Sequence, residues 1–216
     1  PGARLILIGD ADQLPSVGAG RILNDLLDSE RFATVRLTEI FRQAEASLIV
    51  TNAHAVNRGQ MPVLTVKDND FFYLPRVQDR TIAETIVELC HTRLPRTYGK
   101  ATEGGIQIIT PSRRGEAGTE NLNRLLQEQL NPPASHKKEL TFRETVFREG
   151  DRVMQIKNNY DILWTRGEEE GSGIFNGDVG IITMIDPNTE MLTVLYDDRE
   201  ASYDFTQLNE LEPAYA

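Results

Sequence analysis

Residues 4–8 read RLILI and residues 9–20 read GDADQLPSVGAG, so a short apolar run stops at a loop rich in glycine and aspartate. An apolar run of this length, ended by glycine, is typical of a strand buried in a sheet. Residues 21–29 then carry isoleucine and leucine at helical spacing. The stretch therefore predicts a strand, a loop and a helix in succession, which is the repeating unit of an α/β fold.

The same alternation continues toward residue 130. Residues 47–58 and 81–94 have apolar side chains in helical register, whereas residues 71–74 and 106–110 are short strand candidates. Strands interleaved with helices favour a parallel sheet with helical crossovers. We therefore predict an α/β architecture for this part of the chain.

The pattern changes at residues 130–133, LNPP, because two consecutive prolines forbid continuation of a helix. Four short stretches rich in Val, Ile or Tyr follow, separated by turn residues, and these are residues 152–157, 179–185, 192–196 and 201–205. They predict a small all-β barrel. Residues 168–173 lack an apolar anchor and are expected to form a mobile loop.

Composition and charge narrow the function classes. The chain has 216 residues, enough for one or two domains, and a net charge of −10. Residues 158–216 hold two arginines against thirteen acidic residues, a net charge of −11, so residues 1–157 carry about +1. Since nucleic-acid binding needs clustered Lys and Arg, any such site is expected before residue 158.

Membrane and disulfide classes are also disfavoured. No apolar run approaches the roughly 18 residues of a membrane span, so we expect no membrane partner and a cytoplasmic location. The single cysteine, Cys90, cannot form an internal disulfide and is expected to be a small buried hydrophobe.

The loop at residues 9–20 lacks both the dinucleotide fingerprint and the lysine of a Walker A loop. Its position after a predicted strand suits a phosphate site, but a plain structural loop fits its periodicity equally well. Asp10 and Asp12 form either a metal pair or a turn in which at least one carboxylate caps the backbone. With no third carboxylate nearby, we favour the cap and predict no metal site.

Four strings, in order, resemble one family. The loop at residues 9–20 resembles motif III of superfamily one DNA helicases, in the form of the RecD-like branch, and residues 37–44, LTEIFRQA, resemble motif IV. Residues 109–119, ITPSRRGEAGT, resemble the body of the second RecA-like domain. Residues 150–155, GDRVMQ, and residues 175–180, FNGDVG, resemble the SH3-like barrel inserted in that domain.

This resemblance implies an α/β fold made of partial RecA-like P-loop NTPase domains, each a parallel sheet with helices, plus an inserted small all-β SH3-like barrel. The implied divisions are residues 1–40 for the end of the first RecA-like domain, 41–145 for the first part of the second, 146–210 for the barrel and 211–216 for the return. The Walker motifs and a His-Lys-Ser-Gln-Gly type string, which the family also has, are absent from the 216 residues. We therefore expect the chain to be a fragment of a longer helicase.

The resemblance also implies a nucleotide site that binds ATP and Mg²⁺ in the full-length parent. Gln13 is expected near the γ-phosphate, and Arg42 is expected to reach the same phosphate from the other domain, as an arginine finger does. Gly9, Asp10 and Asp12 complete the expected cofactor-binding set. In the family, magnesium is held mainly by the Walker motifs.

Candidate DNA contacts lie at a predicted strand end before a glycine-containing loop and a helix, where hydroxyl, guanidinium and backbone N–H groups suit phosphates. These residues are Thr110, Ser112, Arg113 and Arg114; the alternative is a solvated basic turn. His54 and Asn57, on or near one helix face, are further candidates, although a satisfied histidine is the commoner case. Tyr160 and Trp164 either stack on a base or close the barrel core or its loop, and the local acidity favours the second.

By resemblance, the function is ATP-dependent translocation on single-stranded DNA and unwinding of forked DNA, in repair and recombination, with the fragment inactive alone. Its partners are then DNA, the remainder of its own chain, and nuclease or helicase subunits. Two alternatives stay open: a non-catalytic module that binds DNA or protein, and a subunit of an exodeoxyribonuclease V type complex.

Overall fold

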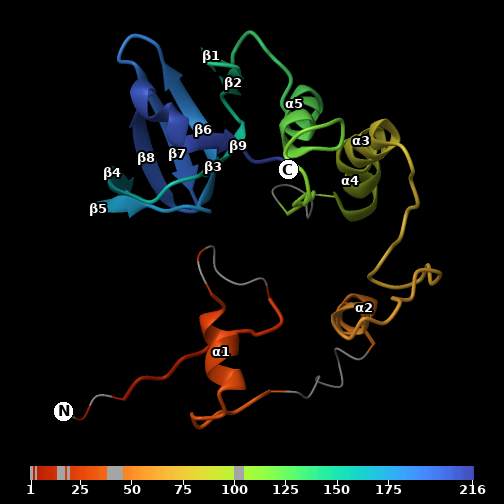
Figure 1. The fold of residues 1–216 in the computed structure, drawn as a ribbon. Coiled ribbons are helices and arrows are strands. Elements are labelled where there is room, and N and C mark those ends of the chain that lie inside the picture. The colour runs from red at the N-terminus through yellow and green to blue at the C-terminus, as the bar shows by residue number, and fades with distance from the viewer. Residues whose placement is uncertain (1, 3, 14–17, 19, 38–45, 100–104) are drawn as a thin grey trace. The chain divides into compact units, whose positions relative to one another are not determined.

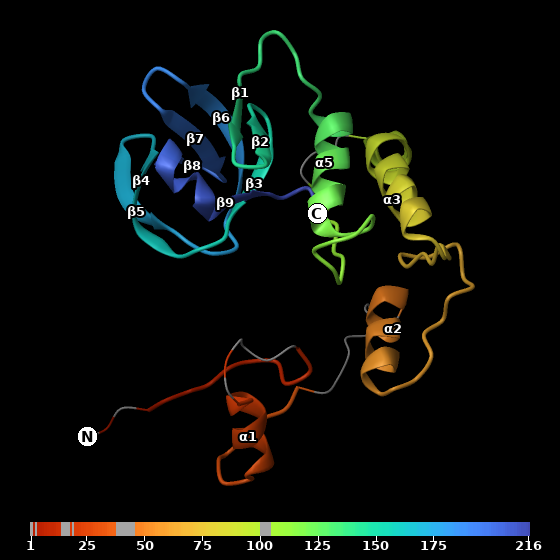
Figure 2. The same cartoon turned by 45° about the horizontal axis from the view of Figure 1, so that its top comes forward.

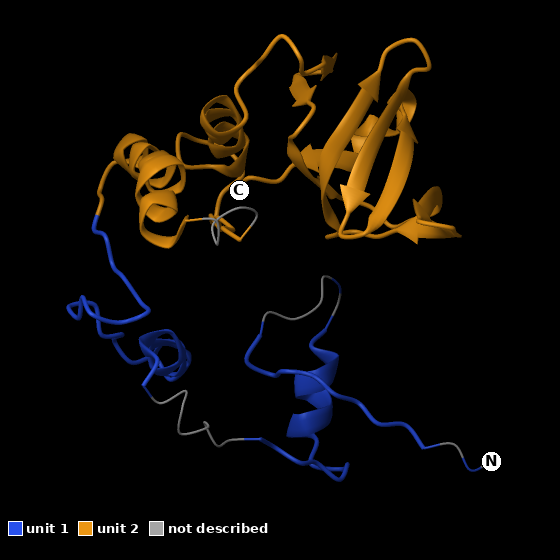
Figure 3. Ribbon diagram, turned by 180° about the vertical axis from the view of Figure 1, so that it is seen from behind, with its two compact units in different colours: residues 1–75 blue, residues 76–216 orange. Residues whose placement is uncertain are grey.

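The computed structural model describes the chain except for residues 1, 3, 14–17, 19, 38–45 and 100–104. The chain divides into two compact units, residues 1–75 and residues 76–216 (Figure 3). Each unit is described by itself.

The first unit contains two helices, α1 (Ile22–Asp28) and α2 (Leu48–Asn57), within the ranges that apolar spacing predicts (Figure 1). Ser47 caps α2 by accepting a hydrogen bond from the Val50 N–H at 3.2 Å. The Asp70 carboxylate also accepts from the Leu48 N–H, at 2.8 Å, and this negative charge suits the positive end of the helix dipole.

The predicted strands at residues 4–8 and 71–74 are wrong, because neither segment is a strand in the structure. Residues 5–8 leave 59 to 95% of each side chain exposed. An apolar run becomes a strand only when a second backbone pairs with it, and among the described residues these segments have no such partner.

The second unit begins with a helical layer. It comprises α3 (Asp79–Glu88), the π-helical turn η1 (Leu89–Arg93), α4 (Leu94–Tyr98) and α5 (Thr119–Leu130). Ala83, Cys90, Leu122 and Leu126 form the core of this layer. Cys90 is 6% exposed, which confirms the prediction of a small buried hydrophobe.

The segment at residues 106–110 packs on this layer without forming a strand, so that prediction is also wrong. Ile106 and Ile108 pack against the helical core, whereas Ile109 is 91% exposed. The side chains alternate as in a strand, but among the described residues the backbone has no paired neighbour.

The rest of the second unit is a β-domain, residues 139–213, whose strands all pair antiparallel (Figure 2). A hairpin of β1 (Glu139–Phe142) and β2 (Thr145–Arg148) stands beside a sheet with the order β5-β4-β8-β7-β6-β3-β9. The sheet strands are β3 (Arg152–Gln155), β4 (Asn159–Arg166), β5 (Glu169–Ile174), β6 (Val179–Asp186), β7 (Met191–Tyr196), β8 (Arg199–Asp204) and β9 (Leu211–Pro213).

The interior of the β-domain combines a large apolar cluster with one buried polar chain. The Tyr196 and Tyr203 hydroxyls are hydrogen-bonded at 2.7 Å, and Tyr203 donates to Gln155 Oε1 at 3.0 Å. Burial raises the pKa of both tyrosines, because the ionised form loses its hydration. Each buried hydroxyl thus has a partner, as a polar group inside a core requires.

The mobile loop predicted at residues 168–173 is wrong, since most of this stretch lies in β5. Trp164 pairs with Gly171 across β4 and β5, and a Cβ on Gly171 would lie 2.2 Å from the Trp164 ring. Glycine therefore lets the indole cover the strand. Trp164 packs against the apolar core, as predicted, whereas Tyr160 is 67% exposed and contacts Phe175 edge to face.

Among the described residues, no helix is long and apolar enough to cross a bilayer. A parallel sheet is not present in the described part of the chain either, because every strand pair there is antiparallel.

Candidate functional site

The motif III loop begins with a turn organised by Asp10. Its Oδ1 accepts the backbone N–H of Asp12, and its Oδ2 accepts from Gln13 Nε2, both at 2.9 Å. The Asp12 N–H, and then the Gln13 amide, lower the pKa of Asp10, because both donors favour the carboxylate form. The prediction that at least one of the two carboxylates caps the turn is confirmed for Asp10.

Gly9 brings this turn close to α1. A Cβ on Gly9 would lie 2.8 Å from Leu23 Cδ2, so the absence of a side chain allows Leu23 to approach the loop backbone. Gly9 thus has a packing role in addition to its expected place near the nucleotide.

The orientation of Gln13 follows from its bond to Asp10. With Nε2 donating to the carboxylate, the side-chain oxygen Oε1 accepts no hydrogen bond within the described residues. Arg42 lies outside the described residues, as do its neighbours in motif IV. The convergence of Gln13 and Arg42 on one phosphate therefore stays a prediction.

The candidate DNA loop, residues 110–118, folds back on the start of α5. Thr110 Oγ1 donates to the Ala117 carbonyl at 2.8 Å. The N–H groups of Thr119 and Glu120 donate to the carbonyls of Ser112 and Arg113, at 3.1 and 3.2 Å. Because the loop itself occupies these two amides at the helix N-terminus, hydroxyl and guanidinium groups are the better candidates to hold phosphates here.

Gly118, directly before α5, makes this turn sterically possible. It is buried, and an added Cβ would lie 2.6 Å from the carbonyl oxygens of Arg113 and Arg114. Two backbone segments approach there more closely than any side chain permits. The sequence reveals the glycine but not the close approach.

The two arginines of the loop differ in their partners. Arg113 donates to Glu120 at 3.0 Å and to Glu212 at 2.6 Å, and these carboxylates, Glu212 first, raise its pKa. Arg114 is exposed, and within the described part of the chain its guanidinium has no hydrogen-bond or ion-pair partner. Arg114 is therefore the better available phosphate ligand.

This difference gives a prediction for binding of single-stranded DNA. Arg114→Ala is expected to weaken binding and to reduce the salt dependence by about one phosphate contact. Arg113→Ala is expected to have a smaller effect, because its charge is already shared with two carboxylates. Fluorescence anisotropy with labelled oligothymidine at several salt concentrations measures both quantities.

Arg166, on the β-domain, provides the control for this measurement. It is paired with Glu169 and lies over the Trp164 ring, its Cζ 5.9 Å from the ring centroid. If Arg166→Ala weakens binding more than Arg114→Ala does, the DNA track lies on the β-domain and its assignment to residues 110–118 is wrong.

The remaining candidates lie on α2. His54 is half-buried and Asn57 is exposed, three residues apart and hence on neighbouring positions of one helix face. Sequence reasoning missed Asn52 on the same helix, which is 4% exposed and exchanges two hydrogen bonds with the Val63 backbone, at 2.8 and 2.9 Å. Asn52 fixes the segment beside α2 and is structural.

No group of three or more His, Cys, Asp or Glu side chains within the described ranges is arranged to hold a metal ion.

Comparison with known proteins gives matches at both ends of the chain. Residues 1–73 match the model of an AAA domain, and residues 122–196 match the SH3 domain of ATP-dependent RecD-like DNA helicases. The first part of the chain is thus similar to an AAA domain, and the later part is similar to the SH3 domain of RecD-like DNA helicases.

Three individual proteins are similar to this chain. The ATP-dependent RecD2 DNA helicase of Deinococcus radiodurans is 31% identical over 217 residues, which cover 100% of this chain and 26% of that protein. The RecBCD enzyme subunit RecD of Mycobacterium tuberculosis is 46% identical over 61 residues, 27% of this chain and 11% of the subunit. An uncharacterised protein, MJ1519, of Methanocaldococcus jannaschii is 23% identical over 98% of this chain and 22% of its own length.

Over its whole length the chain is similar to RecD-like DNA helicases, as the four sequence strings predicted. It spans about a quarter of the RecD2 helicase that it matches.

Proposed function

We propose that this chain is part of an ATP-dependent DNA helicase that translocates on single-stranded DNA and opens forked duplexes. The observation that carries the proposal is the match to the RecD2 helicase, which extends over the whole of this chain. A role in repair and recombination and a cytoplasmic location belong to the same proposal. So do a RecA-like arrangement of residues 1–145 and the insertion of the barrel between residues 146 and 210.

At the nucleotide site, Gln13 orients the water that attacks the γ-phosphate. Its amide is held by Asp10 through Nε2, which leaves Oε1 to accept a hydrogen bond from that water. Arg42 binds the same phosphate and stabilises the charge that develops during transfer. Mg²⁺, when bound, would neutralise further phosphate charge, and by family resemblance the Walker motifs would hold it.

At the DNA site, Thr110, Ser112 and Arg114 hold phosphates of the tracking strand, and Arg113 contributes a charge that Glu120 and Glu212 partly balance. His54 and Asn57 of α2 are further proposed contacts with single-stranded DNA. Phosphate contacts of this kind position a strand without reading its sequence, as a translocating enzyme requires.

Gln13→Ala tests the proposed nucleotide site. Loss of a polar group that acts on the transition state is expected to lower DNA-stimulated ATP turnover by about 10²- to 10³-fold. Nucleotide-free binding of single-stranded DNA is expected to remain unchanged. Steady-state phosphate release and oligothymidine anisotropy, measured on the full-length protein, check the two expectations.

The exposed Gln60 offers a matched control, since Gln60→Ala removes the same amide away from the loop. Asp10→Ala is expected to give an intermediate loss of turnover, because Gln13 then loses its orienting partner. Turnover of Gln13→Ala equal to that of Gln60→Ala would contradict the proposed role.

Residues 1–216 alone are proposed neither to bind ATP tightly nor to hydrolyse it, because they contain no phosphate-cradling Walker loop. Isothermal titration of the 216-residue polypeptide with ATP checks this. The proposal would be refuted if that polypeptide hydrolysed ATP and kept this activity in Gln13→Ala and Arg42→Ala.

A second candidate function is membership of a helicase–nuclease complex, favoured by the local 46% identity to the RecD subunit of RecBCD. Co-purification of the full-length protein with nuclease subunits from the same organism would support this function. A protein that unwinds forked DNA by itself, and binds no such subunit, would support the stand-alone helicase.

A further inference from the structure

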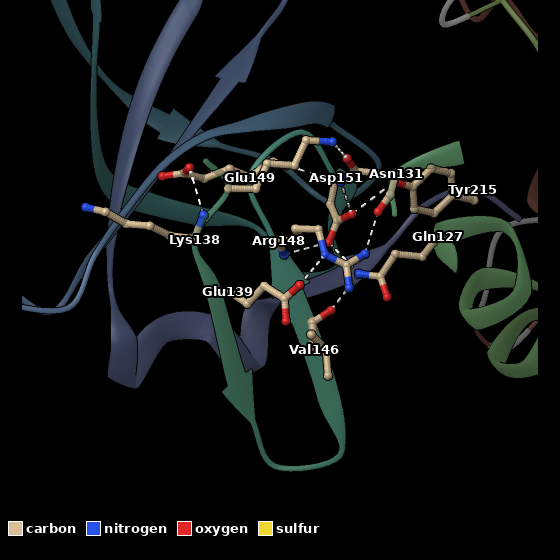
Figure 4. Close-up of polar contacts among 10 residues, drawn as sticks. Gln127, Asn131, Lys138, Glu139, Val146, Arg148, Glu149, Asp151 and Tyr215 are labelled. Atoms are coloured by element: carbon tan, nitrogen blue, oxygen red, sulfur yellow. Dashed lines mark hydrogen bonds and ion pairs between the residues drawn. The ribbon is translucent and has the colours of Figure 1, made fainter. Parts of the chain in front are cut away.

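The family motif GDRVMQ contains a carboxylate that neither the nucleotide site nor the DNA site uses. Asp151 is fully buried and accepts four hydrogen bonds, as Figure 4 shows. Its donors are Gln127 Nε2 at 2.6 Å, Asn131 Nδ2 at 2.7 Å, the Arg148 N–H at 2.7 Å and Tyr215 Oη at 2.9 Å. The carboxylate is fully satisfied without an Arg or Lys side chain bonded to it.

The four donors come from three separate segments. Gln127 and Asn131 lie at the end of α5, Arg148 ends β2, and Tyr215 follows β9, the last strand of the β-domain. The chain therefore enters and leaves the β-domain at one buried charge. Burial and the nearby Asp151 charge raise the pKa of Tyr215, which keeps its hydroxyl a donor.

Neighbouring contacts strengthen this junction. Asn131 also donates to the Glu149 carbonyl at 3.2 Å, and its own backbone carbonyl accepts from the Arg148 guanidinium. A Cβ on Gly150 would lie 3.1 Å from the Asn131 side chain, and its φ of +91° favours glycine. Gly150 and Asp151 of the motif are thus explained by contacts with α5.

The two ends of α5 carry different features. The loop at residues 110–118 adjoins its N-terminus, and the Asp151 junction holds its C-terminal half, within a helix of twelve residues. A helix of that length is a stiff rod of about 18 Å. Displacement at one end is therefore transmitted to the other.

We propose that Asp151 is a positioning residue that fixes the β-domain on α5, so that the β-domain and the loop at residues 110–118 move as one body. The functional consequence, that the β-domain and this loop move together as the enzyme advances along DNA, rests on the proposed function. The rigid connection itself does not.

Asp151→Asn tests the connection with almost no change in size. A carboxamide presents an N–H₂ group to one of the two pairs of donors, Gln127 with Arg148 or Asn131 with Tyr215. In one orientation the new N–H₂ group faces the Gln127 amide and the Arg148 N–H. In the other it faces the Asn131 amide and the Tyr215 hydroxyl. In both cases two N–H donors then point at each other. The exposed Asp161→Asn makes the same chemical change on the β-domain surface and serves as the control.

Double electron–electron resonance on the full-length protein measures the result. One nitroxide pair, at Gln129→Cys on α5 and Glu200→Cys on β8, spans the junction, with Cys90→Ala and any other native thiols replaced. A second pair, at Thr183→Cys and Glu200→Cys, lies within the β-domain and reports its own fold. The first distance distribution is expected to be narrow in the parent and in Asp161→Asn, and to broaden or gain a second peak in Asp151→Asn.

Broadening across the junction with an unchanged distance inside the β-domain supports the proposal, and a narrow distribution in Asp151→Asn overturns it. If both distance distributions broaden, the β-domain itself is disturbed, and the milder Tyr215→Phe, which removes one donor, is used instead. It supports the proposal if only the distance across the junction broadens, and it overturns the proposal if that distance stays narrow. The readout needs no ATP turnover, so it fails or succeeds independently of the helicase function. If an Asp151→Asn protein with a loosened junction still unwinds forked DNA at the parental rate, the rigid connection stands. Only its proposed role in movement along DNA is then overturned.

Discussion

Arg42→Ala is expected to abolish most of the DNA-stimulated ATP turnover of the full-length protein. An arginine that binds the transferred phosphoryl group is worth about 10³- to 10⁵-fold in rate in related chemistry, because it neutralises charge that develops in the transition state. Steady-state phosphate release measures the loss. The affinity for single-stranded DNA without nucleotide is expected to be unchanged.

Two further variants sharpen this prediction. Arg42→Lys keeps the charge but loses bidentate geometry, so its turnover is expected to lie between the parent and Arg42→Ala. Arg58→Ala removes an exposed arginine that follows α2 and is the control. Near-parental turnover of Arg42→Ala would show that the motif IV arginine does not act on the phosphate.

Gly180→Ala is expected to cause a large loss of stability in the β-domain. An added Cβ would lie 2.6 Å from the Leu195 carbonyl oxygen and from Val194 Cγ1, and 2.8 Å from Tyr196 Cδ1. Backbone and core atoms must both move, so the expected cost is about 3 kcal/mol, the upper end of the usual range for overpacking. Urea unfolding followed by Trp164 fluorescence reports this directly, since Trp164 is the single tryptophan of the 216 residues.

Gly167→Ala shows how much stability is lost through backbone strain alone, for comparison with the packing clash in Gly180→Ala. Gly167 has a φ of +60°, and a Cβ there would have no neighbour within 4 Å. Its substitution is therefore expected to cost only the conformational term, about 1 kcal/mol. Equal losses in the two variants would refute the packing explanation for Gly180.

Local sequence patterns predicted the elements that local interactions determine. Apolar side chains at helical spacing located α1 and α2 to within a residue or two, and β-branched runs between turn residues located β3, β6, β7 and β8. In these segments, the side chains that create the pattern are largely the ones that the fold covers.

Elements that depend on distant partners were not predicted. β5 reads EEGSGI and has poor strand propensity, yet it forms because β4 supplies the ladder and Trp164 covers Gly171. Conversely, the apolar run at residues 4–8 has a strong strand pattern and, among the described residues, no strand beside it. Strand pairing, rather than the strand propensity of the sequence, therefore decided both cases: it made β5 a strand, and its absence within the described part of the chain left residues 4–8 without one.

The candidate site shows the same division. The Asp10 turn was predictable because its contacts lie within three residues of sequence. The ion pair between Arg113 and Glu212 joins positions 99 residues apart, and the donors of Asp151 are amides and a phenol with no local signature. The strings that resemble the helicase family include Arg113 and Asp151, but they give no indication of these distant partners.

The Asp151 junction also limits how the protein can be divided for experiments. A polypeptide cut to the sheet boundaries, residues 139–213, would discard Gln127, Asn131 and Tyr215 and leave an anion stripped of three ligands in its interior. The smallest piece that keeps all four donors to Asp151 starts in α5 and includes Tyr215. The match to the helicase SH3 domain starts at residue 122, inside α5 and upstream of Gln127 and Asn131, and it ends at residue 196.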